Sequence, residues 1–305
     1  MYFMNILYTI APIFFIIAFG YFLTCRRVLS EEFISEANRF VFRFPLPFLI
    51  FIGIVKAGLK STGWLPIVSV TVPAFIVVGI ALTIAKVAGH TRGKLGSFVQ
   101  STFHGNVAYV GLAMLFYMLG EEGLEKGSLL AGTLILFNNA LAIIILAMSS
   151  GGHRNPLRIA VSILTTPIIM ATFAGIIFVL AGLSMPAPLM KSMEIVANIS
   201  LPLALIIIGG SISPGMLRKT FRTSALATIL KVFVLPGTAL LFYRLFSPNI
   251  REAFPAMVLL ATPTAITAYI MAREMDGDAE IASGAITLST FVSPAVYLFW
   301  MMMLR

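Results

Sequence analysis

The chain has 305 residues, of which 59% are hydrophobic and 11% are charged, and its mean hydropathy is +1.00. Because ordinary soluble domains carry about 25% charged residues, this composition excludes a soluble enzyme or binding domain and indicates a polytopic membrane protein. The net charge of +9 comes from lysines and arginines scattered over short loops, a pattern that gives no basic face for nucleic acid. A single cysteine, Cys25, excludes an internal disulfide.

In chain order, the apolar stretches predict an all-α protein with ten transmembrane helices. A helix needs about 20 predominantly apolar residues to cross a bilayer. The first stretch has no basic start and no small-residue cleavage site, so we interpret it as a retained helix and not as a signal peptide. The predicted spans are 4–24, 36–55, 65–88, 96–119, 127–148, 158–182, 189–212, 223–245, 253–273 and 280–303.

Proline and glycine positions indicate that the chain consists of two related halves, 1–150 and 151–305. Several of them recur at an offset of 155 residues. Each half holds five spans, and because five is odd, the second half enters the membrane from the opposite side, as an inverted repeat. The matching positions are Pro12 with Pro167, Gly20 with Gly175, and Leu46-Pro47 with Leu201-Pro202.

Loop charges predict that both termini lie outside the cytoplasm. In this orientation the inner loops hold 11 lysines and arginines and the outer segments hold 7. Cytoplasmic loops normally carry the excess of these residues. For a bacterial-type protein this places the chain in the inner membrane.

Two spans carry interruptions near their middles. In the fourth span, Gly105 weakens the helix and Asn106 places an amide where lipid is expected. In the ninth span, Pro263 removes a helical N–H and clashes with the preceding turn, and Thr262 and Thr264 supply hydroxyls that satisfy the freed groups. Interrupted spans at corresponding places in two halves indicate a transporter binding site. Two half-helix N-termini that face one cavity form a site for an anion.

Other polar residues within the spans are candidates for the same site. Lys231 in the eighth span either contacts an anionic substrate or neutralises the negative ends of the broken helices. Asn138 and Tyr109 either line the cavity or stabilise helix packing. His104 either senses protons or is a core histidine with satisfied hydrogen bonds.

The sequence lacks the residues that cation exchange, metal binding, nucleophilic catalysis and nucleotide binding require. No Asp or Glu lies in the middle of a span, which argues against cation exchange of the buried-carboxylate type. Metal-ligand spacing, a nucleophile elbow and a nucleotide-binding loop are also missing, so the sequence predicts no enzyme activity, no metal and no cofactor.

These residues in this order resemble the auxin efflux carrier family, and in particular its bacterial, malonate-transporter-like members. The resemblance covers essentially the whole chain. The motifs that carry it are Leu46-Pro47, Asn106 with Gly111, Thr166-Pro167-Ile168, Leu201-Pro202 with Gly209-Gly210, Lys231 with Pro236, and Pro263 with the Ala-rich stretch that follows.

The resemblance implies that helices four and nine are broken and cross, and that a moving part carries small organic anions past a scaffold in an elevator mechanism. Asn106 would contact the substrate carboxylate and Pro263 would mark the crossing. The chain departs from the family pattern at Ala113, where the family often has proline, so the break in the fourth span rests on Gly105 and Asn106.

The sequence therefore predicts a secondary transporter for a small carboxylate, either auxin-like or a dicarboxylate, in the lipid bilayer. Coupling to sodium, to protons or to the membrane potential stays open, as does a homodimer. The alternatives are a sodium-coupled symporter resembling bile-acid carriers, a non-transporting sensor, and an intramembrane enzyme that pairs His104 with Ser101.

Overall fold

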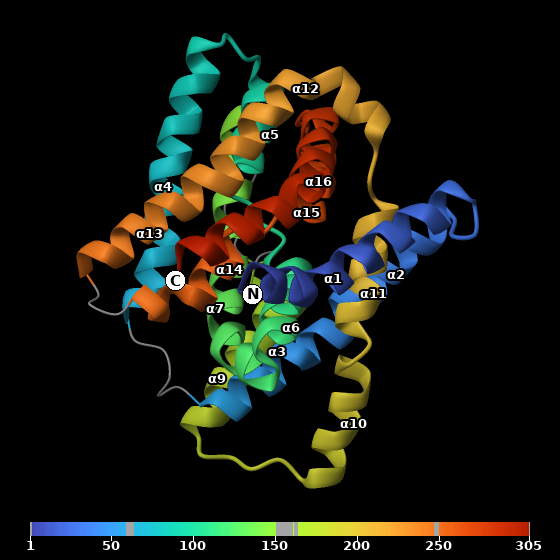
Figure 1. Ribbon diagram of the computed structural model, residues 1–305, viewed down its shortest axis with the longest axis vertical. Coiled ribbons are helices and arrows are strands. Elements are labelled where there is room, and N and C mark those ends of the chain that lie inside the picture. The colour runs from blue at the N-terminus through green and yellow to red at the C-terminus, as the bar shows by residue number, and fades with distance from the viewer. Residues whose placement is uncertain (1, 59–63, 151–160, 162–163, 247–249, 305) are drawn as a thin grey trace. The chain divides into compact units, whose positions relative to one another are not determined.

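The computed structural model describes residues 2–58, 64–150, 161, 164–246 and 250–304. Helices occupy parts of all ten predicted spans, and the described residues form no strand (Figure 1). Seven helical stretches are long and apolar enough to cross a membrane, and Val107–Leu119 and Pro167–Leu180 are shorter apolar helices. The polytopic all-α class is thus confirmed. The ten-span inverted repeat stays a prediction, and its joint at 150–151 and the start of span 158–182 lie outside the fully described residues.

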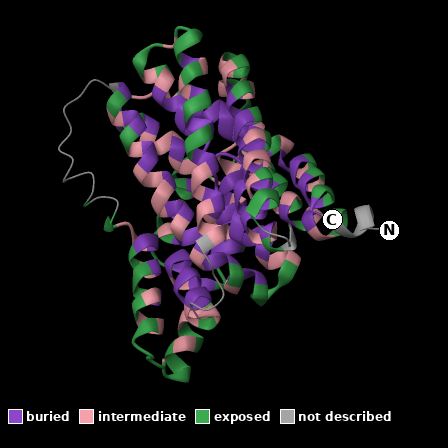
Figure 2. Ribbon diagram, turned by 90° about the vertical axis from the view of Figure 1, so that its left-hand side faces the viewer, coloured by how far each residue is buried: buried purple, intermediate pink, exposed green. Residues whose placement is uncertain are grey.

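The exposed surface of the helices is largely apolar. Large side chains such as Phe15 on α1 and Phe291 on α16 are 72% and 81% exposed. Figure 2 shows buried and exposed residues on the same helices. Apolar exposure on this scale is unfavourable in water, whereas lipid chains solvate it without cost.

The helices form two compact units, each drawn from both halves of the sequence. In the first unit, α1 packs against α11, and α3 packs against α9 and α10. Pro45 starts α3 directly after α2, because proline is tolerated in a first helical turn. The helices of this unit are α1 (Tyr2–Cys25), α2 (Glu31–Arg43), α3 (Pro45–Ala57), α6 (Leu112–Leu119), the first part of α7 (Glu121–Ser150), α9 (Pro167–Leu180), α10 (Ala187–Ala197) and α11 (Ser200–Gly210).

In the second unit, α16 packs along α12 and also contacts α5 and α15. Asp278 caps α16, since its carboxylate accepts a hydrogen bond from the Ile281 N–H at 3.0 Å. The helices of this unit are α4 (Trp64–Val87), α5 (Arg92–Ser101), the rest of α7, α12 (Pro214–Ile229), η3 (Leu230–Val234), α13 (Leu235–Phe246), η4 (Ile250–Ala253), α14 (Phe254–Leu260), α15 (Ile266–Glu274) and α16 (Ala279–Met303). The π-helical turn η2 (Val107–Gly111) begins at Val107, the last residue of this unit's first segment.

Candidate functional site

The structure interrupts both helices where the sequence predicts. The helix α5 ends at Ser101, and the chain becomes helical again at Val107, where η2 begins. The helix α14 ends at Leu260, and α15 begins at Ile266. Each span thus consists of two helical pieces joined by a few non-helical residues.

The two non-helical segments pair with each other in the second unit. The Asn106 N–H donates to the Pro263 carbonyl at 2.7 Å, and the Ala265 N–H donates to the His104 carbonyl at 2.9 Å. Gly105 and Thr264 therefore form an isolated antiparallel bridge. Backbone groups that leave a helix inside a membrane must find partners within the protein, and here each break supplies them to the other. We call this pair of segments, residues 104–106 and 262–265, the crossing.

Lys231 holds the end of one half-helix beside the crossing. Its Nζ donates to the carbonyls of Leu260 and Thr262 at 2.7 and 2.8 Å, and the residue is 1% exposed. Leu260 is the last residue of α14, whose C-terminal carbonyls carry partial negative charge. Of the two roles that the sequence left open for Lys231, this geometry supports the neutralisation of a broken helix end.

Gly105 makes room for Lys231. A Cβ at this position would lie 2.9 Å from the Lys231 Nζ and would also collide with the Thr262 hydroxyl. Any larger residue would therefore push the lysine away from the carbonyls it bonds. The glycine that weakens the fourth span is also needed for this close approach.

The helix around Lys231 is itself irregular, for a local reason. Pro236 has no N–H, so the carbonyl four residues earlier, on Val232, loses its helical donor. The residues Leu230–Val234 form a π-helical turn, and the Trp300 Nε1–H donates to the Val232 carbonyl at 2.8 Å. The proline and the tryptophan together stabilise the turn that carries Lys231.

Hydroxyl groups complete the hydrogen bonding of the crossing. The Thr262 hydroxyl donates to the Leu259 carbonyl at 2.8 Å, and the Thr264 hydroxyl donates to the Ser101 carbonyl at 3.1 Å. The Thr264 N–H donates to Ser289 Oγ on α16 at 3.0 Å. Sequence reasoning missed Ser289, because nothing in the chain around it distinguishes it from the other hydroxyls of α16.

Both ring nitrogens of His104 have partners. Nδ1 lies 3.3 Å from Gln100 Nε2, Nε2 lies 3.3 Å from the Thr267 hydroxyl, and the residue is 4% exposed. The Ser101 hydroxyl donates to the Ser97 carbonyl at 2.7 Å. His104 is thus built into the core, and its spacing of four residues from Gln100, which would pair the two side chains in a continuous helix, is a signal that could have identified this partner.

Two further candidates take no part in the hydrogen bonds described above. Tyr109 belongs to the first unit, where its hydroxyl donates to Asn38 Oδ1 at 2.7 Å. Asn138 lies on the part of α7 in the second unit and is 2% exposed, and its Oδ1 has no hydrogen-bond partner among the described residues. The crossing brings together His104, Gly105, Asn106, Lys231, Thr262, Pro263 and Thr264.

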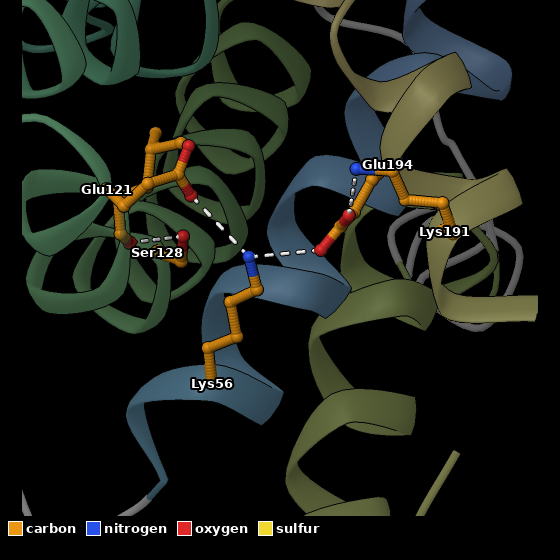
Figure 3. A network of polar contacts seen from close by, with 6 residues as sticks. Lys56, Glu121, Ser128, Lys191 and Glu194 are labelled. Atoms are coloured by element: carbon orange, nitrogen blue, oxygen red, sulfur yellow. Dashed lines mark hydrogen bonds and ion pairs between the residues drawn. The ribbon is translucent and has the colours of Figure 1, made fainter. Parts of the chain in front are cut away.

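The first unit contains a separate polar pocket of about 170 Å³ that sequence reasoning did not identify. Lys56 in the last turn of α3 pairs with Glu194 of α10 at 3.1 Å and with Glu121 of α7 at 3.6 Å (Figure 3). Lys191 lies 3.5 Å from the other oxygen of Glu194. These pairs link three helix ends, and they are partly exposed, so each contributes little to stability.

Among the described residues, no group of three or more His, Cys, Asp and Glu side chains lies close enough to hold a metal ion.

Comparisons with known proteins give one consistent result. A family model described as membrane transport protein matches residues 5–160 and 157–301. An uncharacterized transporter of Methanothermobacter thermautotrophicus is 26% identical over the full length of both chains. A protein of Rhizobium meliloti named "Putative malonate transporter" is 24% identical over 94% of this chain and 92% of its own. An uncharacterized transporter of Methanocaldococcus jannaschii is 24% identical over 92% of this chain and 93% of its own.

Proposed function

Because the chain belongs to the membrane transport protein family of the auxin efflux carrier type, we propose that it is a secondary transporter for a small organic anion, which binds at the crossing. The observation that carries the proposal is the pairing of the two broken helices at Gly105 and Thr264. Broken helices that meet within a membrane protein supply helix ends to a substrate at mid-depth.

The helix ends favour a negative charge at the crossing. The pieces that begin at Val107 and Ile266 start directly after it, and each helix N-terminus carries about half a positive charge. We infer that Asn106 donates its amide to a substrate carboxylate, and that Thr262, Thr264 and Asn138 are further contacts. The malonate named for the relative from Rhizobium meliloti makes a dicarboxylate the first substrate to test.

We infer an elevator-type cycle, in which a moving part carries the crossing past a scaffold part. The family membership supports this mechanism, because alternating access in secondary transporters is largely rigid-body motion of one part of the protein against another. We place the protein in the cell inner membrane with both termini outside, on the charge of its loops, and we propose no enzymatic step.

Lys231 favours a cycle without sodium. In transporters with broken helices, the carbonyls at half-helix C-termini coordinate sodium ions. Here the Lys231 Nζ already donates to the carbonyls of Leu260 and Thr262 at the end of α14. The sodium-coupled symporter stays the alternative, and uptake that requires sodium would support it.

The test is the flux of labelled malonate and of an aromatic acid into sealed liposomes that contain the purified protein. We expect uptake by the wild type, and a loss of about tenfold or more for Asn106→Ala, since a bond to a charged carboxylate contributes roughly 1.5–3 kcal/mol. Asn198→Ala, at the exposed end of α10, is the matched control and should leave uptake unchanged.

Other outcomes would redirect the proposal. Equal flux in the wild type and Asn106→Ala would place the site elsewhere. Ligand binding with no wild-type flux for any acid would indicate a sensor. Product formation in detergent, without a sealed compartment, would support an enzyme.

A further inference from the structure

We propose that Lys231 is a proton-binding site of the transporter, and that a proton taken up there enters together with the organic anion. This inference rests on the proposed function and names its coupling ion. It starts from the two hydrogen bonds of the lysine, its position beside the crossing, and a line of hydroxyls that leads to it.

The hydrogen bonds of Lys231 survive the loss of a proton. A protonated lysine has three N–H donors, and a neutral amine keeps two. The described structure gives Lys231 two acceptors, the carbonyls of Leu260 and Thr262. The third proton can therefore leave the nitrogen and return to it while both bonds to the end of α14 stay in place.

The charge of Lys231 acts directly on an anion at the crossing. The Nζ lies beside Gly105, and charges interact strongly where water is excluded. Among the described residues of this unit, the other buried ionisable side chains are His104, Tyr243 and Tyr297, and no Asp or Glu is buried. Protonation of Lys231 thus strengthens anion binding, and release of the anion favours release of the proton.

A line of hydroxyls along α12 leads from Thr220 toward Lys231. The Thr220 and Ser224 hydroxyls lie 2.9 Å apart, and Thr228 and Lys231 follow at spacings of four and three residues, which lie on one face of a regular helix. This face meets α16, which runs alongside α12 (Figure 1), because a Cβ on Gly284 would collide with the Thr220 and Ser224 hydroxyls. The Thr220 end of this line lies next to the exposed ion pair between Lys219 and Glu280 at 3.0 Å.

Two buried hydroxyls along this contact need a partner. The hydroxyls of Thr228 on α12 and Thr290 on α16 have no hydrogen-bond partner among the described residues, and the two residues are 4% and 3% exposed. Buried polar groups left without protein partners are normally satisfied by internal water. Water between these hydroxyls would form a chain along which a proton moves from the exposed end to the Lys231 nitrogen, where it converts the amine to the ammonium form.

The experiment uses liposomes that contain the full-length protein, a trapped pH dye and a clamped membrane potential, with malonate as the probe. We expect internal acidification that follows labelled malonate uptake in the wild type. In Lys231→Arg the side chain keeps its charge and donors but cannot release a proton. Net uptake by this variant should fall about tenfold, and the exchange of internal for external malonate should fall far less, because exchange needs no proton release.

A second variant keeps the test valid if the arginine disturbs folding. Thr228→Val removes one hydroxyl of the line and should slow net uptake several-fold without changing malonate exchange. Thr238→Val is the matched control on α13, where the hydroxyl bonds the Val234 carbonyl. Malonate uptake without acidification in the wild type, or equal loss of uptake and exchange in both Lys231→Arg and Thr228→Val, would overturn the proposal. The absence of any wild-type malonate or aromatic acid flux would instead overturn the proposed function.

Discussion

Gly105 combines two requirements at one position in the chain. Because it has no side chain, it weakens a helix, and this effect can be predicted from the sequence. It also leaves space for the Lys231 Nζ and the Thr262 hydroxyl, and this contact is seen only in the folded chain. Asn106 combines two roles in the same way, because its backbone N–H pairs with Pro263 and its side-chain amide is the proposed contact for the substrate.

At this scale we expect Gly105→Ala to impair both stability and transport. The added methyl group displaces Lys231 or Thr262, and overpacking of this kind costs about 1–3 kcal/mol. The measurements are the midpoint of thermal unfolding in detergent and malonate flux in liposomes.

Gly79→Ala provides the control for this substitution. Gly79 lies within α4 and a Cβ there would meet no atom within 4 Å, so this change should stabilise the helix by about 0.5–1 kcal/mol. Equal unfolding midpoints and equal flux for the two variants would show that Gly105 is not constrained by its neighbours.

At the scale of elements, η3 and α13 depend on a contact from the end of the chain. Pro236 deprives the Val232 carbonyl of its helical donor, and Trp300 on α16 replaces it. The π-helical turn that carries Lys231 is thus a property of two helices together. Lys56 gives the first unit a comparable link, since it pairs with carboxylates of both α7 and α10.

We expect Trp300→Phe to destabilise the protein by about 1–3 kcal/mol, because the Val232 carbonyl is left buried without a donor. Thermal unfolding measures this loss, and malonate flux should fall with it because the turn positions Lys231. Phe291→Leu, on an exposed face of the same helix, should change neither quantity. An unfolding midpoint for Trp300→Phe equal to that of the wild type would show that the carbonyl finds another partner.

At the scale of the whole molecule, the group that binds the carbonyls at the end of α14 determines whether transport is coupled to sodium. We expect malonate uptake to be unchanged when sodium is replaced by choline on both sides of the liposome membrane, because Lys231 already bonds the Leu260 and Thr262 carbonyls. A strict requirement for sodium would contradict this expectation and favour the symporter.

Much of the architecture could be predicted from local features. The apolar stretches predict the helices, and Gly105 and Pro263 predict the two interruptions, which the structure places between Ser101 and Val107 and between Leu260 and Ile266. The sequence did not predict the partners of the candidate residues. Tyr109 and Asn138 were grouped with the crossing, yet Tyr109 bonds Asn38 in the first unit, and Asn138 lies on α7 without a hydrogen-bond partner for its Oδ1 among the described residues.

A polytopic helical membrane protein with two interrupted spans follows from the chain alone, because the length of an apolar helix and the effect of proline or glycine on it are local properties. Which groups contact one another is known only from the folded chain. The carbonyls that Lys231 bonds lie 29 and 31 residues further along the chain, and the crossing pairs segments that are still more distant. The physical reason is that a freed backbone group in a membrane must be satisfied by whatever the packing brings near it, and packing depends on the whole chain.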